Sequence, residues 1–445
     1  MSFSSRQELE LLKEALDTLE PGFSDLPGFM PTFDPAAIGA VLQEVATRMQ
    51  DNFPYHHPRY AGQMLKPPHP VARVAYALAL WLNPNNHALD GGRASSAMEK
   101  ECIDALGRLF DLPQVLGHLC GGGTMANLEA LWVAGQLQPG KAIAASSQAH
   151  YTHQRISSVL GLDFVAIEST AAGRIDLSSL QATLASGDVG TVVVTMGTTG
   201  LGAVDPLADI LDLRREFDFR VHVDAAYGGY FTLTSKLDEQ PRRHFARMNE
   251  ANSIVIDPHK HGYQPYGCGC VLFSDPKVGA LYRHDSPYTY FSSADLHLGE
   301  ISLECSRPGA AAVALWATQR LLPMLPGGEF AAALDRSLRA ASILWQRVRQ
   351  SDRYVALMPP ELDIVVFGVE ARDAKSASLS AREVFARAAD AKLYLALIEL
   401  PVPLVRAWWP DLEDNAATVT CLRSCLMKPE HLDWIDDLWE VLAGC

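Results

Sequence analysis

A lysine at position 260 follows a short apolar run and could present its amine to a ligand. The run at residues 254–256 predicts a buried strand, and Pro258 cannot continue the hydrogen-bond ladder of a sheet. Lys260 would therefore lie just past the carboxyl end of a strand, where α/β proteins open their ligand crevice. A lysine in such a pocket can form a Schiff base with a carbonyl group. Taken alone, an ordinary solvated loop lysine is the commoner explanation.

A glycine-rich stretch supplies a candidate anion site. Residues 121–127 read Gly-Gly-Gly-Thr-Met-Ala-Asn and precede a helical pattern over residues 128–134. The backbone N–H groups of a helix N-terminus, its dipole and the Thr124 hydroxyl together suit a phosphate group. A flexible turn before a helix explains the glycines equally well. The stretch is neither a Walker loop nor a G-x-G-x-x-G fingerprint, and no strand pattern precedes it, so a nucleotide is not indicated.

Three further residues suit a planar cationic ligand. Asp224 ends the apolar strand predicted at 221–223, where an unpaired carboxylate would be costly, so it needs a cationic partner such as a protonated pyridine nitrogen. The small Ala226 could lie flat against a ring, and His150, after the strand predicted at 143–145, could stack on one. A helix cap or salt bridge would also explain Asp224, and a structural role would explain His150. An anion cradle, a stacking histidine, an aspartate and a lysine near successive strand ends together predict a pyridoxal phosphate site.

The composition favours small molecules as ligands. The 445 residues are 48% hydrophobic and 20% charged, which predicts a globular chain with one large domain and a smaller one. A net charge of -15 without a basic run argues against nucleic acid and against an anionic membrane surface as partners. The eight cysteines lack a disulfide-like rhythm and no apolar leader opens the sequence, so we expect a reducing cytoplasm. His259, His261, Cys268 and Cys270 have weak spacing for a metal site, and no metal is predicted.

Apolar runs alternate with helical patterns from about residue 97 onward. This alternation predicts an α/β fold with a mostly parallel sheet covered by helices on both faces. We expect an N-terminal helical arm at 1–60, a large α/β domain at 61–325 and a small α+β domain at 326–445. No internal repeat or transmembrane span is predicted. The predicted strands of the large domain are 143–145, 164–167, 192–195, 221–223, 254–256 and 271–273.

Four motifs together resemble the group II pyridoxal-phosphate-dependent amino-acid decarboxylases. They are Gly-Gly-Thr at 122–124, Ala-His at 149–150, His-Val-Asp-Ala-Ala at 222–226 and Asp-Pro-His-Lys at 257–260. The family includes glutamate, cysteine-sulfinate, aromatic-amino-acid and archaeal tyrosine/aspartate decarboxylases, and the resemblance extends from about residue 55 to the C-terminus. It implies fold type I of the pyridoxal-phosphate enzymes, with a mostly parallel seven-stranded sheet, a smaller C-terminal α+β domain and an N-terminal helical arm.

The resemblance also implies roles for single residues. Lys260 would form the Schiff base, Asp224 would pair with the pyridinium nitrogen, and His150 would stack on the ring opposite Ala226. Met125 stands where the family often has a serine, so one hydroxyl for the phosphate is missing here. The implied cofactor-binding residues are Gly123, Thr124, Met125, His150, Thr198, Asp224, Ala226, His259, Lys260 and Ser306.

Further segments bear on substrate and catalysis. The run His-Pro-Arg-Tyr-Ala-Gly-Gln at 57–63 is similar to the glutamate and cysteine-sulfinate branch, in which the residue matching Gln63 faces substrate. Arg423 is the natural candidate to anchor a substrate carboxylate. The segments at 286–293 and 305–310 resemble the archaeal branch, whose mobile loop delivers a catalytic tyrosine. That alignment favours Tyr288 as the acid, with Tyr290 as the alternative.

The expected reaction is decarboxylation of an L-amino acid, acidic or aromatic, to its amine and carbon dioxide, with Lys260, Tyr288, His150 and Asp224 as the catalytic set. An aminotransferase or a carbon–carbon lyase on the same scaffold is the alternative within enzymes, and a catalytically silent homologue is the alternative outside them. The resemblance places Ser306 and Arg307 near the phosphate bound by a partner subunit, which implies a homodimer with shared sites.

Overall fold

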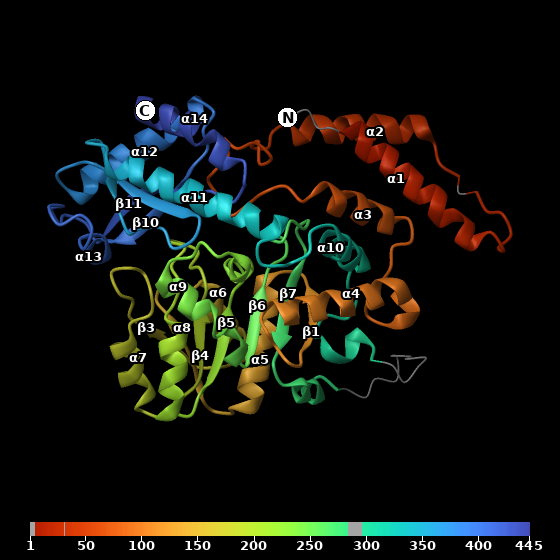
Figure 1. The fold of residues 1–445 in the computed structure, drawn as a ribbon, viewed down its shortest axis with the longest axis horizontal. Coiled ribbons are helices and arrows are strands. Elements are labelled where there is room, and N and C mark those ends of the chain that lie inside the picture. The colour runs from red at the N-terminus through yellow and green to blue at the C-terminus, as the bar shows by residue number, and fades with distance from the viewer. Residues whose placement is uncertain (1–4, 31, 284–295) are drawn as a thin grey trace.

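The computed structural model of the chain describes residues 5–30, 32–283 and 296–445. Two β-sheets organise these residues: a seven-stranded sheet in the order β1-β7-β6-β5-β4-β2-β3 and a four-stranded sheet in the order β10-β11-β9-β8. The sheets occupy different parts of the molecule, and α11 extends from the smaller sheet toward the larger one (Figure 1). The fold is therefore built from two layered units, one around each sheet.

The larger sheet confirms the predicted mostly parallel architecture. Strands β2 to β6 pair in parallel, and β7 pairs antiparallel with both β6 and β1. Parallel strands place their carboxyl ends on one edge of a sheet, which is where the predicted site residues follow them. The strands are β1 (Leu116–Cys120), β2 (Ala142–Ser146), β3 (Phe164–Ile167), β4 (Val189–Thr195), β5 (Arg220–Asp224), β6 (Ser253–Ile256) and β7 (Gly269–Phe273).

Strand β1 corrects the expectation that no strand precedes the glycine-rich stretch. Its sequence, Leu-Gly-His-Leu-Cys, has no β-branched residue, so its pattern is weak. Gly117 is required because a Cβ there would lie 2.5 Å from the Val271 carbonyl oxygen of β7. Close backbone packing, which sequence periodicity does not report, therefore selects glycine inside this strand.

Helices cover both faces of the larger sheet. Along β4, Val192 and Val194 belong to the main core cluster, whereas Val193 packs on the opposite face. On that opposite face Ala126 of α5 packs in a cluster with Val255. Burial on both faces explains why these strands are continuously apolar. The helices are α1 (Ser5–Leu19), α2 (Pro35–Met49), α3 (Pro70–Leu80), α4 (Leu89–Leu109), α5 (Gly123–Leu137), α6 (Thr152–Leu160), α7 (Leu177–Leu184), α8 (Leu207–Asp212), α9 (Glu239–Phe245), α10 (Gly309–Leu321), α11 (Glu329–Arg349), α12 (Ala374–Asp390), α13 (Val402–Val405) and α14 (His431–Gly444).

The smaller sheet is entirely antiparallel and has a hydrophobic cluster of its own. Leu344 of α11, Phe367 and Leu422 are buried in that cluster. Its strands are β8 (Tyr354–Ala356), β9 (Ile364–Val369), β10 (Ala396–Pro401) and β11 (Thr418–Cys425). This arrangement fits an α+β unit, while domain boundaries at residues 60 and 325 stay a prediction.

Residues 59–61 attach to this C-terminal unit rather than to the larger sheet. The Cys425 N–H donates to the Ala61 carbonyl over 2.7 Å, and Tyr60 bridges to Tyr394. Arg59 forms an ion pair with Asp437 of α14. Ala61 is fully buried in the cluster of the smaller sheet. A segment from the start of the sequence thus completes a core built mostly by its end.

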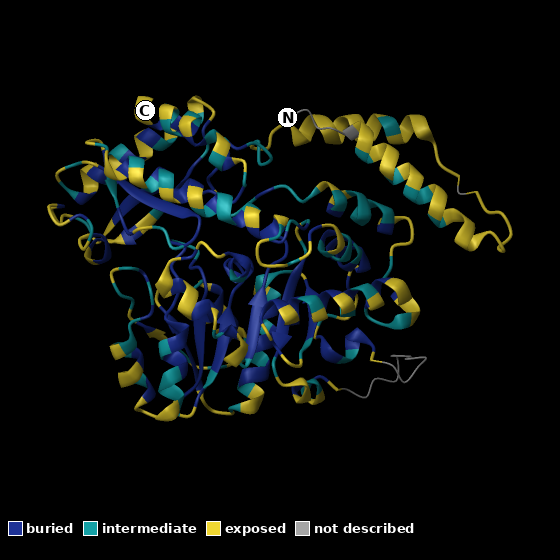
Figure 2. Ribbon diagram, in the orientation of Figure 1, coloured by how far each residue is buried: buried dark blue, intermediate teal, exposed yellow. Residues whose placement is uncertain are grey.

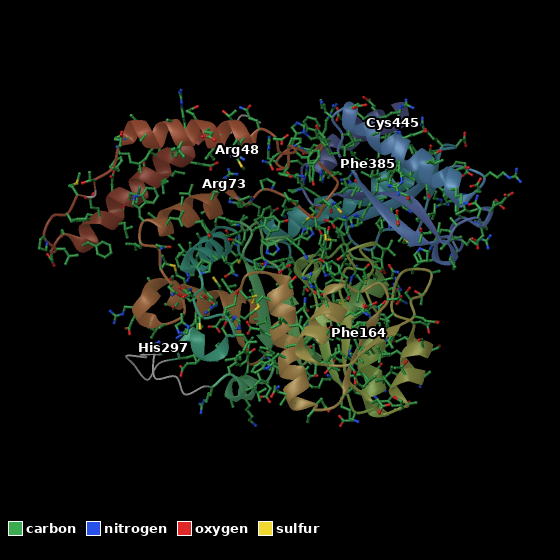
Figure 3. The ribbon with its side chains drawn as sticks, turned by 180° about the vertical axis from the view of Figure 1, so that it is seen from behind. Arg48, Arg73, Phe164, His297, Phe385 and Cys445 are labelled. Atoms are coloured by element: carbon green, nitrogen blue, oxygen red, sulfur yellow. The ribbon has the colours of Figure 1, made fainter. Side chains whose placement is uncertain are left out.

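The N-terminal arm carries an apolar stripe that the single chain leaves exposed. Helix α2 has no buried residue. Its arm projects from the body, with mostly exposed residues along it (Figure 2). The arm contacts the body through α1, where Glu8 forms an ion pair with Arg73 of α3; Arg73 is labelled in Figure 3. The exposed apolar residues of α2 are Ile38, Val41, Leu42, Val45 and Met49.

All eight cysteines are free, and seven of them are buried. The exposed one is Cys305. Among the helices formed by the described residues, none combines the length and the apolar character needed to cross a bilayer.

Candidate active site

A cavity of about 560 Å³ opens where the parallel strands of the larger sheet end. The residues that line it come from the segments that follow β1, β2, β4, β5 and β6. The structure therefore brings together side chains that lie up to 145 residues apart in sequence. Of the predicted site residues, Gly123, Thr124, Met125, His150, Asp224, Ala226, His259 and Lys260 line this cavity.

Lys260 is presented by a tight turn after β6. The Lys260 N–H donates to the Asp257 carbonyl over 2.9 Å, and the Asp257 N–H donates to the Ala226 carbonyl. The Lys260 Nζ atom lies 3.3 Å from Asp257 Oδ2, so an aspartate that the sequence analysis left without a role pairs with the lysine. Asp257 is buried, and its Oδ1 atom has no hydrogen-bond partner among the described residues. The signal was present in sequence as a carboxylate three residues before the lysine.

The glycine-rich stretch forms the N-terminus of α5. Gly122 has φ of +147°, a conformation that disfavours any side chain, and α5 begins at Gly123. A Cβ on Gly269 would lie 2.5 Å from Gly122, so the start of β7 packs directly against this turn. The first N–H groups of α5 are unused by the helix and point toward the cavity edge, together with the Thr124 hydroxyl. This geometry suits a phosphate group.

Asp224 is held as a carboxylate at the end of β5. The Ala226 N–H donates to Oδ1 over 3.1 Å, and His153 Nε2 lies 2.9 Å from Oδ2. Burial opposes ionisation, but the hydrogen bond and charge of His153 outweigh it, and the pKa of Asp224 lies well below its usual range. His153 is a functional residue that the sequence analysis missed. Its signal is its place on the first turn of α6, three residues after His150.

His150 lies at the cavity with Thr152 as its partner. Its Nδ1 atom is 2.7 Å from the Thr152 hydroxyl. Burial lowers the pKa of His150. A neutral imidazole has a ring face that can pack on a planar ligand, as the sequence analysis expected. Ala226, on the segment after β5, lines the same cavity and is nearly fully buried.

Two of the predicted cofactor residues, His259 and Thr198, form hydrogen bonds with the protein backbone around the cavity. His259 lines the cavity, and its Nδ1 atom donates to the Cys268 carbonyl over 2.8 Å, which fastens the Lys260 turn to the start of β7. Thr198 is fully buried and does not line the cavity; its hydroxyl accepts the Ala203 N–H instead. Its neighbours Gly197 and Thr199 reach the cavity. The turn directs alternate residues inward, so Thr198 lies behind the cavity wall, and its role toward the cofactor stays a prediction.

Ser306 and Arg307 bond to other residues of their own chain, and their expected place near the phosphate bound by a partner subunit stays a prediction. The Ser306 hydroxyl accepts from the Asn85 side chain, and Ser306 does not line the cavity of its own chain. Arg307 is buried and forms an ion pair of 2.7 Å with Glu99 of α4. Glu99 also accepts the Leu119 N–H of β1. The arginine thus holds the strand that leads into the glycine turn and is turned away from solvent.

Gln63 and Arg423 are brought together, as a shared substrate role would require. Arg423 Nη2 donates to the Gln63 side chain over 2.9 Å, and Arg423 Nη1 donates to the Thr199 carbonyl over 2.8 Å. Neither residue lines the cavity itself, whereas Thr199 does. Arg423 is buried on β11, and its Nε atom has no partner among the described residues. Tyr288 and Tyr290, the candidate acids, lie outside the described residues.

The residues present fit pyridoxal phosphate. The α5 N-terminus and Thr124 suit its phosphate, the ionised Asp224 suits a protonated ring nitrogen, and Lys260 suits its aldehyde. A side chain could not replace Gly123, because its Cβ would lie 2.7 Å from Asp257 Oδ2. Asp257, whose Oδ1 atom has no partner among the described residues, also lines this cavity.

Comparison with known proteins decides the family. The model of the pyridoxal-dependent decarboxylase conserved domain matches residues 132–370, more than half of the chain. The chain belongs to the pyridoxal-dependent decarboxylase family. A probable L-tyrosine/L-aspartate decarboxylase of Methanothermobacter thermautotrophicus is 30% identical over 320 residues, which cover 70% of this chain and 84% of that protein. The L-tyrosine decarboxylase of Enterococcus faecium is 29% identical over 411 residues, which cover 70% of this chain and 66% of that enzyme.

A solved structure of Oryza sativa TDC with PLP and tryptamine has the same fold. It superposes with a TM-score of 0.78 at 18% identity and covers all of this chain and 99% of that one. The expected fold type, the cofactor and the enzyme class, a pyridoxal-phosphate-dependent amino-acid decarboxylase, are thereby confirmed. The residue roles within the decarboxylase site stay predictions.

The buried Arg307–Glu99 pair gives the first test. We expect Arg307→Met to lower the free energy of unfolding by about 3–5 kcal/mol, because it leaves the Glu99 carboxylate buried without its partner. Urea unfolding of the holoenzyme measures the change. The matched control is Arg320→Met, which breaks the exposed pair with Glu101 between α10 and α4 and should cost far less, because water screens that pair. Equal losses in the two variants would contradict the structural role of Arg307.

Proposed function

We propose that this chain removes the α-carboxylate of an L-amino acid as carbon dioxide and releases the corresponding amine. The observation that carries the proposal is the convergence of Lys260, Asp224 and the α5 N-terminus on one cavity in a member of this family. Pyridoxal phosphate, when bound, supplies a conjugated ring that accepts the electrons of the breaking carbon–carbon bond.

The chain's own residues hold and orient the reacting groups. Lys260 would bind the cofactor aldehyde, and Thr124 with the N–H groups of α5 would bind its phosphate. Asp224, kept ionised by His153, would hold a proton on the ring nitrogen, which keeps the ring electron-poor. His150 would cover one ring face and exclude water from it, opposite Ala226.

A proton must reach the substrate carbon after carbon dioxide leaves. We keep Tyr288 as the proposed acid and Tyr290 as its alternative, on the resemblance of residues 286–293 to the archaeal branch. The described lining of the cavity contains two tyrosines, Tyr227 and Tyr266. The Tyr266 hydroxyl donates to the Met64 carbonyl, and burial raises its pKa. Burial raises the pKa of Tyr227 far above its usual value, and its hydroxyl is committed to Asp363, which makes it a poor donor.

The substrate is proposed to be an acidic or an aromatic L-amino acid, with aspartate and tyrosine first. The similar proteins of Methanothermobacter thermautotrophicus and Enterococcus faecium carry the names of tyrosine and aspartate decarboxylases. Arg423 reaches the cavity wall through its Nη1 bond to the Thr199 carbonyl, so its guanidinium is the proposed anchor for a carboxylate of the substrate.

Release of carbon dioxide from a panel of amino acids tests the reaction. We expect the holoenzyme to form tyramine or β-alanine, or the amine of another acidic substrate, in equal amounts with carbon dioxide. Lys260→Ala should lose at least about a thousandfold in rate, because the cofactor would no longer be held and released through a lysine. Borohydride should fix the cofactor to the wild-type chain and not to this variant. Keto acid formed without carbon dioxide would favour an aminotransferase.

Arg423 gives a test of substrate recognition. We expect Arg423→Lys to raise KM at least about tenfold with a smaller change in kcat, because an ammonium group lacks the planar array of donors that bonds to both Gln63 and the Thr199 carbonyl and so fixes the cation beside the cavity. Steady-state kinetics with the best substrate of the panel measure the split. Gln63→Ala is the companion variant and should show a smaller rise, since Gln63 acts through Arg423. An unchanged KM in Arg423→Lys would contradict the assignment.

We further propose a homodimer in a reducing cytoplasm. Five apolar residues of α2 recur at the spacing of a buried helical stripe, yet all are exposed in the single chain. They are Ile38, Val41, Leu42, Val45 and Met49. A second copy of the chain, covering the arm, would bury them. Eight unpaired cysteines accord with a reducing compartment.

The arm gives a test of the dimer. We expect the double variant Val41→Asp with Val45→Asp to shift the protein from dimer toward monomer, because two carboxylates would be buried without partners at the interface. Light scattering after size exclusion measures the mass. Gln43→Asp adds a charge to the same helix off the stripe and should leave the mass unchanged. A monomeric wild type, or a dimer unaffected by the double variant, would refute the arm as the contact.

A further inference from the structure

A chain of buried polar groups links the glycine turn to Asp224. Asn127, on the first turns of α5, donates through Nδ2 to the Gly123 carbonyl over 2.8 Å and lies 3.5 Å from Asp224 Oδ2. Its Oδ1 atom is 2.7 Å from His222 Nε2. His222 Nδ1 is 2.8 Å from the Ser253 hydroxyl. Asn127, His222 and Ser253 are each at most 5% exposed, so water does not compete for these contacts.

The acceptors at one end fix which way every hydrogen points. The Gly123 carbonyl and the Asp224 carboxylate can only accept, so the Asn127 NH₂ group must face them. The amide oxygen then faces His222, whose Nε2 must carry a hydrogen to donate to it. Burial, the largest cause, lowers the pKa of His222 to about 3, so the ring is neutral and Nδ1 accepts the Ser253 hydroxyl.

The reverse arrangement would oppose the charge of Asp224. If His222 carried its hydrogen on Nδ1, Nε2 would be an acceptor and would favour a flipped Asn127 amide. The flipped amide would place its oxygen against the Gly123 carbonyl and near the Asp224 carboxylate, which are two repulsive contacts. The hydrogen on His222 Nε2 therefore holds the Asn127 amide in the orientation that both acceptors need.

We propose that Asn127, oriented by His222, is a positioning residue that sets the distance between the two ends of the cofactor site. Gly123 begins the helix whose N-terminus would hold the cofactor phosphate, and Asp224 would pair with the ring nitrogen; both residues line the cavity. With the same NH₂ group, Asn127 donates to the Gly123 carbonyl and approaches the Asp224 carboxylate. The inference rests on the proposed place of Asp224 at the ring nitrogen, and it goes further by naming what holds that carboxylate in register with the phosphate cradle.

Cofactor binding by the apoprotein tests the proposal without relying on turnover. We expect Asn127→Ala to raise the dissociation constant for pyridoxal phosphate about tenfold, the loss expected for one buried hydrogen bond. The dissociation constants for inorganic phosphate and for pyridoxal, each measured alone, should change less than about threefold, because each occupies one end only. The control is Asn252→Ala, which removes a part-buried amide just before β6, at the end of that strand away from the cavity, and should leave all three constants unchanged.

The His222 variants separate positioning from packing. His222→Gln keeps an N–H donor for the Asn127 oxygen and should bind pyridoxal phosphate within about threefold of wild type, whereas His222→Leu should match Asn127→Ala. Two results would overturn the proposal: equal losses in His222→Gln and His222→Leu, or a phosphate constant that rises as much as the cofactor constant in Asn127→Ala. If the variants do not fold, nitrogen NMR of the wild-type imidazole decides, since a hydrogen on Nδ1 of His222 contradicts the arrangement.

A cofactor analogue without the ring nitrogen distinguishes this proposal from the site assignment beneath it. The 1-deaza analogue of pyridoxal phosphate should bind wild type more weakly than the natural cofactor, and Asn127→Ala should weaken it less than it weakens the natural cofactor. Equal binding of both cofactors to wild type overturns the placement of Asp224 at the nitrogen. If wild type binds the natural cofactor more tightly than the analogue, but Asn127→Ala weakens the binding of the two by the same factor, only the positioning role of Asn127 is overturned.

Discussion

The ionised carboxylate of Asp224 is the constraint on which the site depends. A charge buried at the end of a strand is stable only if its surroundings supply donors, and here the Ala226 N–H and His153 do so. Those donors come from the turn after β5 and from α6, so the carboxylate fixes the relation between two segments at the carboxyl edge of the sheet. A protonated pyridine ring would pair with the same carboxylate. The contacts that stabilise this charge in the protein without cofactor are therefore the ones that would prepare it for the cofactor.

Much of the catalytic edge could be predicted from sequence, because local rules place it. Lys260 and Asp224 follow apolar strands, and parallel strands bring their ends to one edge. The glycine turn precedes a helix, and helix N-termini bind anions whatever the fold. The positions of these residues could be predicted from the order of helices and strands along the chain, and in the structure they line one cavity.

The features that could not be predicted from sequence depend on contacts that are distant along the chain or on the shape of a single turn. Arg307 pairs with Glu99, more than two hundred residues earlier, and no local sequence pattern reports that pair. Sequence alone does not show that Gly197 and Thr199 line the cavity while Thr198 lies behind it, because this depends on how one turn directs alternate residues. Strand β1 lacked the usual residue types because its backbone packs too closely against β7 for a side chain at Gly117. His153 was missed because its partner, Asp224, lies on another strand.

The attachment of residues 59–61 to the C-terminal unit bears on the order in which the protein can fold. Ala61 accepts a hydrogen bond from Cys425, and Arg59 pairs with Asp437, so this core joins segments more than 360 residues apart. During synthesis the early segment leaves the ribosome long before its partners exist. The larger sheet can close while the ribosome is still translating, whereas the smaller unit must wait for the last helix. Such long-range closure is slow, and until it occurs the growing chain exposes apolar surface that a chaperone could bind.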